Sequence, residues 1–571
     1  MSLTLAGSEN RSETGSGQPL QACFPLAVPR ACQLEALNFI ADSINQGYRD
    51  IVVEAPTGVG KSGIGAAVCY WAGQLDTLRR FSPERAGDRA LATGGYYLVT
   101  QKLLQDQLER DFPVFRSVAG GSGTCLKSAS EYYCPAFGTC GVGCKVPHSK
   151  DGTTKSCERR KDGSCSYAQA KAAYMSHNLA VTNYAYFLTE RMYANQMPNR
   201  PVLVLDECHN VERTLLKFPE MVISEKWLER MEMRVKKAPE FANIQEYAQW
   251  LSLTYLPVVQ ERAANALENL TLAGDGASPV ERRKLSELVS HSQRVAVAAA
   301  DMLEDASNWV FWQEDVEREG YSAIAKPLNA APYMHLLTEA APIRVYMSAF
   351  PGLRSVFCRS LGLNRDHVAW CALPSDFPVE NRPIVMALIG SMSRRNMDES
   401  LPPVLRTIEK ILKKHGTQKG LIHCNSYALG EAIVRYFSGK PEGRRLRFPR
   451  NADDRETAFK QHAASTGASV LVSPSMTEGF DFKDDLARFQ VLAKMPYPYL
   501  GDKQTAAKKE MDAEWYAMET IKQVIQMTGR VCRSESDSGV SYVLDADFMR
   551  LWEGHEKDFP GWWRDACVWP S

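Results

Sequence analysis

Residues 53–62 read Val-Glu-Ala-Pro-Thr-Gly-Val-Gly-Lys-Ser, and this stretch decides the fold. The apolar run Ile51-Val52-Val53 precedes it, and a helix-forming stretch from Gly63 to Trp71 follows it. Strand, glycine-containing loop and helix make the phosphate-binding P-loop arrangement, because glycines let backbone N–H groups turn toward phosphates. Lys61 can reach the β- and γ-phosphates, and Ser62 can bind Mg²⁺. The predicted nucleotide contacts of the loop are Ala55, Pro56, Thr57, Gly58, Val59, Gly60, Lys61 and Ser62.

A second strand delivers the acidic residues that such a loop requires. Residues 201–205, Pro-Val-Leu-Val-Leu, form a buried-strand run that ends in Asp206 and Glu207. In a P-loop ATPase the first carboxylate would hold Mg²⁺, and the second would orient and deprotonate the attacking water. His209 follows and would couple this site to neighbouring domains. The alternative for the loop, a chance turn ending in Gly-Lys-Ser, becomes weak once this Asp-Glu pair is present.

Two arginines near the end of the chain are candidates to contact the transferred phosphate. Arg530 and Arg533 lie three residues apart, so a helix would place them on one face together with Gln526. Guanidinium groups neutralise the charge that develops on a phosphoryl group during transfer. A salt-bridged surface is the alternative, and the P-loop with its Asp-Glu pair favours the catalytic interpretation.

Arg30 and Gln33 precede the P-loop by one element, just ahead of a predicted amphipathic helix over residues 34–46. Their side chains could read the edge of an adenine base. They could equally be the polar start of a helix, and the sequence does not separate these two interpretations.

A cysteine-rich segment separates the P-loop from the Asp-Glu pair. Six of the 15 cysteines fall within about forty residues that hold few large apolar side chains, so a metal centre would replace a core. Thiolate ligands suit a [4Fe–4S] cluster. Zinc is a less favoured interpretation, because the paired Cys-x₂-Cys spacing of zinc fingers is missing, and free thiols are the third. The six are Cys125, Cys134, Cys140, Cys144, Cys157 and Cys165.

The composition is that of an ordinary soluble globular protein in a reducing, cytoplasmic compartment. The 571 residues suggest about three to four domains. Lys plus Arg and Asp plus Glu both number 67, so any nucleic-acid site must be a local basic channel. No apolar run reaches the length of about 18 residues that a transmembrane helix needs. Residues 1–19 are polar and predict a disordered leader without the apolar region of a signal peptide.

In this order, the motifs resemble those of superfamily 2 helicases of the XPD/DinG type, over about residues 25–555. Residues 55–62 look like helicase motif I, and residues 206–209, Asp-Glu-Cys-His, look like the DEAH box of motif II. Ser-Ala-Phe at 348–350 stands at motif III, and residues 526–533 stand at motif VI. Thr-Glu-Gly-Phe-Asp at 477–481 stands at motif V, which adds Asp481 to the implied nucleotide contacts.

Two positions depart from the family pattern. Cys208 replaces the Ala of the DEAH box, which is a change of one small residue for another. Phe350 replaces the Thr of Ser-Ala-Thr in motif III. Because that motif links hydrolysis to strand movement in the family, the second departure puts the mode of coupling in doubt.

The resemblance also implies that the cysteine-rich segment is the family's iron–sulfur domain. Residues 126–134 look like its entry motif and residues 165–167 like its exit. The implied cluster ligands are Cys134, Cys144, Cys157 and Cys165, with Cys140 as the alternative to Cys144 and Cys125 as a bystander.

The implied fold is α/β, with two RecA-like P-loop motor domains and two insertions in the first. The predicted parts are a leader at 1–20, a first motor domain at 21–118, 168–210 and 320–373, a cysteine-rich iron–sulfur domain at 119–167, a helical Arch domain at 211–319, a linker at 374–383 and a second motor domain at 384–571.

The resemblance implies an ATP-dependent DNA helicase that uses Mg²⁺, translocates 5′ to 3′ on single-stranded DNA and unwinds duplexes. Its partners would be single-stranded and forked DNA, with no membrane, and it would act as a monomer. One alternative is a single-strand translocase that remodels protein–nucleic acid complexes, as a phage-encoded or CRISPR-associated DinG-like protein would. Another is a non-catalytic nucleic-acid-binding scaffold stabilised by zinc.

Overall fold

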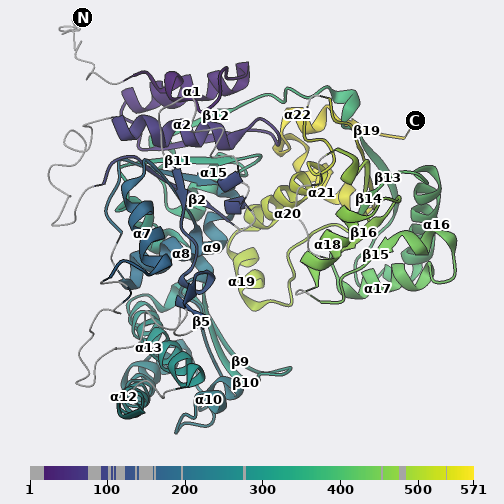
Figure 1. Ribbon diagram of the computed structural model, residues 1–571. Helices are drawn as coiled ribbons and strands as arrows, with labels where there is room; N and C mark the ends of the chain where they lie inside the picture. The colour runs from purple at the N-terminus through teal and green to yellow at the C-terminus, as the bar shows by residue number, and fades with distance from the viewer. Residues whose placement is uncertain are drawn as a thin grey trace, which may run out of the picture.

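Two parallel β-sheets of seven strands each form the centres of two α/β domains, on the left and right of Figure 1. A third body, made of helices and a small antiparallel sheet, lies below the first domain. None of the helices placed in the structure is both long and apolar enough to span a bilayer. The structure, a computed structural model, describes residues 18–74, 92–100, 104–106, 108–110, 123–134, 138–140, 159, 162–194, 197–273, 278–451, 454–474, 482, 484–534 and 536–570.

The first sheet has the strand order β12-β1-β11-β7-β2-β6-β3, and all its neighbouring strands run parallel. Its central strands are almost continuously buried, as expected where helices cover both faces. The strands are β1 (Asp50–Glu54), β2 (Gly95–Val99), β3 (Gly123–Cys125), β6 (Leu179–Asn183), β7 (Val202–Asp206), β11 (Ile343–Ser348) and β12 (Val368–Ala372). The helices of this domain are α1 (Ala31–Asn45), α2 (Lys61–Gln74), α7 (Ser166–Ser176), α8 (Tyr184–Thr189), α9 (Val211–Lys217), α14 (His335–Thr338) and α15 (Arg354–Leu361).

The second sheet, β15-β16-β14-β17-β18-β13-β19, is also parallel throughout. The strands are β13 (Ile384–Gly390), β14 (Gly420–His423), β15 (Leu446–Arg447), β16 (Val470–Ser473), β17 (Phe489–Leu492), β18 (Val540–Asp545) and β19 (Cys567–Val568). The helices are α16 (Met397–Lys414), α17 (Tyr427–Tyr436), α18 (Arg455–Ala464), α19 (Lys503–Met511), α20 (Ala513–Thr528), α21 (Asp547–His555) and α22 (Gly561–Arg564). The predicted α/β class with two motor domains is therefore confirmed.

The strand pairing brings the predicted motifs to one edge of the first sheet. β1 pairs with β11 so that Glu54 lies opposite Ser348. β11 pairs with β7 so that Met347 lies opposite Asp206. Because all three strands are parallel, the P-loop, motif III and the Asp-Glu pair follow from the same carboxyl edge, where open α/β sheets bind their ligands.

The third body differs from the prediction of a mostly helical insertion over residues 211–319, because it also contains a sheet. Strands β8 (Met221–Ser224), β9 (Trp309–Val316) and β10 (Gly320–Pro327) form an antiparallel sheet in the order β8-β10-β9. The aromatic and β-branched residues at 309–312 favour a strand, and β9 turns directly into β10. The predicted boundary between residues 319 and 320 therefore divides a hairpin. Its helices are α10 (Glu225–Arg230), α11 (Ile244–Trp250), α12 (Leu256–Ala273) and α13 (Pro279–Glu304).

Hydrogen bonds from Arg200 link the first sheet to α7, the helix that follows the cysteine-rich segment. Its side chain is fully buried just before β7. The guanidinium donates to the backbone carbonyls of Thr93, Tyr174, Met175 and His177 at 2.6–3.0 Å. One side chain thus provides hydrogen bonds to backbone carbonyls at the end of α7 and just before β2. These two segments are far apart in sequence.

Replacing Arg200 by Met should lower the free energy of unfolding by several kcal/mol, because each buried carbonyl left without a donor costs about 1–3 kcal/mol. Denaturant unfolding of the wild type and variant measures the loss. The exposed Arg395 supplies the control, since Arg395→Met removes the same charge without opening buried acceptors. Equal, small losses in the two variants would contradict this account of Arg200.

Glu54, at the end of β1, makes stability depend on pH. Burial raises the pKa of its carboxyl from the ordinary 4.5 to about 7. The folded state therefore binds this proton more tightly than the unfolded chain. The contribution to stability is complete below about pH 4.5 and is lost as the pH rises through about 7.

Glu54→Gln should accordingly stabilise the fold above pH 7, by up to about 3 kcal/mol at about 1.4 kcal/mol per pKa unit. The gain should shrink as the pH falls toward about 5. Denaturant unfolding at several pH values measures it, with exposed Glu431→Gln as the control. A gain that does not change with pH would show that Glu54 is not the titrating group.

Candidate active site

The P-loop connects β1 to α2 and holds the groups predicted to bind phosphate. Gly58 and Gly60 both adopt a φ of +84°, a conformation that residues with a Cβ rarely tolerate. Lys61 begins α2, and its Nζ donates to the carbonyl oxygen of Ala55 at 3.4 Å. Lys61 and Ser62 are half-buried in the first turn of the helix, where backbone N–H groups and the helix dipole favour an anion.

Arg30 and Gln33 lie against the P-loop and hold its backbone. Arg30 Nη2 donates to the carbonyl of Gly58 and Gln33 Nε2 donates to that of Val59, both at 2.8 Å. Gln33 Oε1 also accepts the backbone N–H of Arg30 at 2.9 Å, which caps α1. The helix therefore begins at Ala31, earlier than the predicted residue 34. The polar helix start is confirmed, and the same two side chains support the phosphate loop.

Asp206 ends β7 with its carboxylate buried beside the P-loop. Tyr97 donates its hydroxyl to Oδ2 at 2.8 Å, and the backbone N–H of Glu207 donates to Oδ1 at 2.9 Å. Burial and the carboxylate of Glu207 raise the pKa of Asp206 to about 6, and the positive charge of Lys61 partly offsets them. A bound cation would offset the free-energy cost of burying the negative charge of Asp206. With the hydroxyl of Ser62, the oxygen donors fit Mg²⁺, which prefers oxygen ligands.

The residues after Asp206 connect it to motif III. Glu207 adopts a left-handed backbone, with φ 51° and ψ 48°. Its Oε2 lies 3.4 Å from Nδ1 of His209, which also contacts Ser348 Oγ at 2.8 Å. His209 was predicted to couple the site to neighbouring domains. These two contacts lie within the first domain, and the ring also lines a cavity that the second domain borders.

The predicted helix that carried Gln526, Arg530 and Arg533 together is wrong in its extent. α20 ends at Thr528, so the two arginines follow the helix and do not share its face with Gln526. Gly529 is the C-cap of α20. Beyond the helix, Asp537 Oδ2 accepts the N–H of Arg533 at 2.9 Å. The spacing of three residues therefore did not place the two arginines on one helix face.

The segment after α20 packs on the P-loop across the boundary between the domains. A methyl group placed on Gly58 would lie 2.8 Å from the carbonyl oxygen of Arg533 and would collide with the ring of Phe377. One placed on Gly529 would lie 3.1 Å from Thr57 Oγ1. Glycines at both positions therefore permit a close approach of the two backbones.

Gln526 and Arg530 are both buried in the second domain near this contact. Gln526 Nε2 meets no hydrogen-bond acceptor in the described part of the chain. Burial lowers the pKa of His423, at the end of β14, to about 4, and the positive charge of Arg530 contributes to the shift. Arg530 therefore lies near the carboxyl edge of the second sheet.

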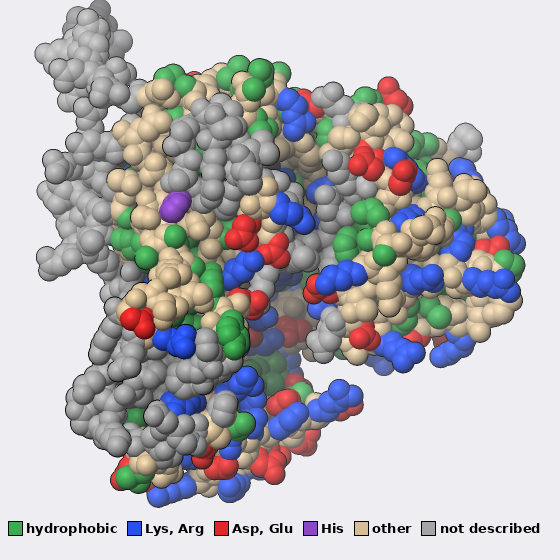
Figure 2. All heavy atoms as spheres, viewed as in Figure 1, with side chains coloured by type: hydrophobic (Ala, Val, Ile, Leu, Met, Phe, Trp, Pro, Cys, Tyr) green, Lys and Arg blue, Asp and Glu red, His purple; other side chains and the backbone are tan. Residues whose placement is uncertain are grey.

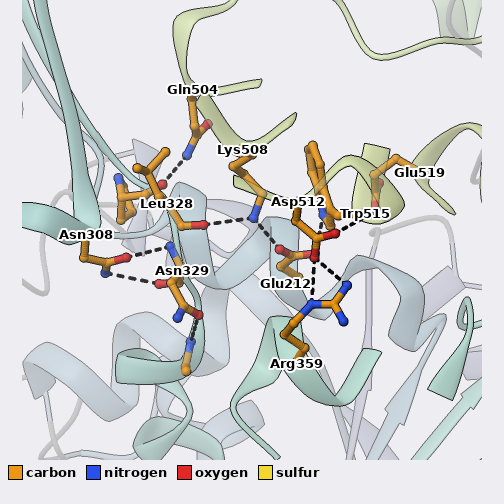
Figure 3. A network of polar contacts seen from close by, with 12 residues as sticks. Glu212, Asn308, Leu328, Asn329, Arg359, Gln504, Lys508, Asp512, Trp515 and Glu519 are labelled. Carbon is orange, nitrogen blue, oxygen red and sulfur yellow. Dashed lines mark hydrogen bonds and ion pairs between the residues drawn. The ribbon is translucent and has the colours of Figure 1, made fainter. Parts of the chain in front are cut away.

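A polar network holds the second domain against α9, the helix that follows His209 (Figure 3). Lys508 Nζ contacts Glu212 Oε1 at 2.5 Å, and Trp515 Nε1 donates to Glu212 Oε2 at 3.0 Å. Lys508 also donates to the carbonyl of Leu328 at 2.9 Å, just after β10. The Lys508 and Glu212 side chains are only 10 % and 11 % exposed. One buried ion pair therefore joins both motor domains and the end of the third body.

A cavity of about 970 Å³ adjoins this network. Figure 2 shows the molecule hollowed between its left and right bodies, with Lys and Arg side chains at the rim. Carboxylates lie among the cations of the lining, and Tyr497 and Trp515 supply aromatic surface. The cationic side chains of the lining are Arg213, Lys217, Lys326, Arg455 and Lys508.

Four of the six clustered cysteines lie among the described residues, and all four are buried. They are Cys125, Cys134, Cys140 and Cys165. The sulfur atoms of Cys140 and Cys165 lie 3.6 Å apart. Among the residues with a described position, no group of three His, Cys, Asp or Glu side chains converges on one point. Cys144, Cys157 and Asp481, with the rest of motif V, lie outside the described residues.

Sequence reasoning missed two residues at this site. Tyr97 lies within the apolar run of β2, so it was indistinguishable from core until the strand order placed it beside Asp206. Phe377 lies in the predicted linker, and its contact with Gly58 depends on the path of that linker. The only available signal was an aromatic residue among the polar residues and prolines at 374–378.

Comparison with known proteins gives matches on both motor domains. Residues 26–257 match the family described as "Type III restriction enzyme, res subunit", and residues 408–566 match the "Helicase C-terminal domain". The "Regulator of telomere elongation helicase 1 homolog" of Caenorhabditis briggsae is 23% identical over 358 residues, which are 52% of this chain and 35% of that protein. The Caenorhabditis elegans protein of the same description is 28% identical over 123 residues, or 19% of this chain and 12% of that protein. The match therefore spans about a third or less of these relatives.

Solved structures with the same fold include "XPD_Helicase", at a TM-score of 0.57 and 14% identity, covering 95% of this chain and 100% of that chain. "Structure of S. tokodaii Xpd4" has a TM-score of 0.52 and 13% identity, with coverage of 95% and 100%. These findings agree with the resemblance of the motifs to superfamily 2 helicases of the XPD/DinG type.

Proposed function

We propose that this chain is an ATP-dependent DNA helicase that moves 5′ to 3′ on single-stranded DNA and unwinds duplexes. The observation that supports it most directly is the close approach of the Arg533 backbone to Gly58 of the P-loop. A nucleotide on the P-loop would lie at the boundary between two domains, so its binding and hydrolysis can change their spacing. The choice of DNA and the direction of movement rest on the resemblance to the family.

The first domain would bind and activate ATP. Lys61 would neutralise charge on the β- and γ-phosphates, while Ser62 and Asp206 would hold the magnesium ion. Mg²⁺, when bound, neutralises phosphate charge and orients the terminal phosphoryl group. Glu207 would orient the attacking water and accept its proton, and its contact with His209 at 3.4 Å supports this placement.

The second domain would complete the site when the domains close. Arg530 and Arg533 would neutralise charge on the phosphoryl group in the transition state. The N–H of Arg533 is fixed by Asp537, which anchors this segment against the P-loop. Gln526, with its buried Nε2, would offer a hydrogen-bond donor to the water or the phosphate.

The cavity beside the Glu212–Lys508 pair would hold the nucleic-acid strand. Cations of its lining such as Arg213, Lys217 and Arg455 can contact phosphates, and Tyr497 can stack on a base, which contributes about 1–3 kcal/mol per base. Glu212 lies on α9, three residues after His209. A strand in the cavity would therefore lie next to the helix that follows the Asp-Glu pair. The third body would serve as the family's Arch and enclose the strand.

We further propose a thiolate-bound metal centre in the cysteine-rich segment, with a [4Fe–4S] cluster as the favoured occupant. The approach of Cys140 to Cys165 supports Cys140 as a ligand more strongly than the spacing did. Zinc is the alternative, because tetrahedral Zn–S bonds of about 2.3 Å place two sulfurs about 3.8 Å apart. None of the cysteines that the structure describes is joined in a disulfide, which agrees with the proposed reducing, cytoplasmic location.

Lys61→Ala should abolish DNA-stimulated ATP hydrolysis, because the phosphates lose their main cation. Steady-state release of phosphate, with and without single-stranded DNA, measures the effect. Lys410→Ala, on the exposed face of α16, is the control and should behave as the wild type. Retained turnover in the Lys61 variant would overturn the motor assignment.

Anaerobically purified protein should be brown and contain about four iron atoms per chain. Cys140→Ser should lose most of the metal, whereas Cys371→Ser, on β12, should keep it. Metal analysis and the visible spectrum of each variant measure this. A colourless wild type with one zinc ion per chain would contradict the cluster and support a zinc site. Full iron content in Cys140→Ser would contradict Cys140 as a ligand and favour Cys144.

A further inference from the structure

The mechanism above leaves one buried polar group next to the phosphate site without a role. Tyr97 lies in the middle of β2 and is 0 % exposed. Its hydroxyl donates to Asp206 Oδ2 at 2.8 Å. The phenol therefore contacts one of the two side chains that would hold the magnesium ion.

The direction of this hydrogen bond makes the contact specific to tyrosine. A phenol has one proton to donate, and Asp206, as a carboxylate, can only accept, so the Tyr97 proton is committed to it. Phenylalanine would fill the same space and remove the bond.

The surroundings of the ring give independent support for its position. A methyl group placed on Gly65, in the second turn of α2, would collide with the Tyr97 ring and would also crowd Met347 and Val204. Glycine inside a helix costs about 1 kcal/mol relative to alanine. The chain thus has a glycine where the ring needs room between α2 and the sheet.

The strand register explains how the phenol reaches Asp206. β2 lies beside β7, with Tyr97 paired to Val204, two residues before Asp206. Tyr97 and Asp206 are distant in sequence, and the pairing of their strands brings them together.

We propose that Tyr97 is a positioning residue that fixes the carboxylate of Asp206 in the orientation that a magnesium ligand requires. This inference rests on the proposed ATP-dependent function. The bond to Asp206 uses one of about four lone-pair positions of the carboxylate, so positions remain for the ion and its waters. Partners that orient metal ligands typically contribute 10–100-fold to metal affinity.

Tyr97→Phe tests this, with binding of a fluorescent ADP analogue titrated with Mg²⁺ as the main measurement. The Mg²⁺ concentration for half-maximal binding should rise about tenfold or more. Binding in EDTA and the melting temperature should change little. ATP hydrolysis at saturating Mg²⁺ should recover toward the wild-type rate, because the ligands themselves are intact.

Tyr96→Phe is the matched control, since Tyr96 is the neighbouring residue of β2 and faces the other side of the sheet. Its hydroxyl donates to the carbonyl of Pro198 at 2.7 Å, away from the phosphate site. This variant loses one buried hydroxyl of the same strand and should keep the wild-type dependence on Mg²⁺.

Three results would overturn the inference. An unchanged Mg²⁺ requirement in Tyr97→Phe would remove the positioning role, and a lower requirement would mean that the phenol obstructs the ion. An equal loss of nucleotide binding with Mg²⁺ and with EDTA would indicate packing alone. Failure of the proposed function is distinguishable, because the wild type itself would then show no Mg²⁺-dependent nucleotide binding.

Discussion

The site depends on one constraint, the parallel pairing of β1, β11 and β7. Parallel strands end at the same edge of a sheet, so the residues that follow them must meet there. The P-loop, Ser348 and Asp206 are separated by long stretches of chain, yet the registers of Glu54 with Ser348 and Met347 with Asp206 bring them together. A slip of one residue would turn each strand's side chains to the opposite face and separate the donors.

Around that edge, two kinds of contact hold the domains together. Glycines at positions 58 and 529 allow the backbone of one domain to approach the phosphate loop of the other. The buried pair of Glu212 and Lys508 adds a charged contact that also reaches the end of β10. Buried pairs contribute little net stability, because desolvation offsets attraction, but breaking one partner is costly. This pair is therefore better understood as fixing the relative position of the domains than as strengthening the fold.

Much of the fold followed from local patterns. The P-loop, the acidic end of β7, both parallel domains and the polar start of α1 could be read from apolar runs and the residues that end them. The end of α20 at Thr528 was missed, because the three-residue spacing of the two arginines suggested that the helix continues. The β9–β10 hairpin was also missed, since a helical pattern on one side of it dominated the interpretation of residues 211–319.

The sequence by itself determined which chemical groups are present and in what order. Lys61, Ser62, Asp206 and Glu207 already indicated phosphate and magnesium chemistry, because few other residue sets at such strand ends serve it. Only the tertiary structure decided which groups act together. Tyr97 has the local pattern of a core residue, and Arg533 that of a helix-face residue. The contact of Tyr97 with Asp206 arises from the strand order, and that of Arg533 with Gly58 arises from the packing of the two domains. No local stretch of sequence encodes either one.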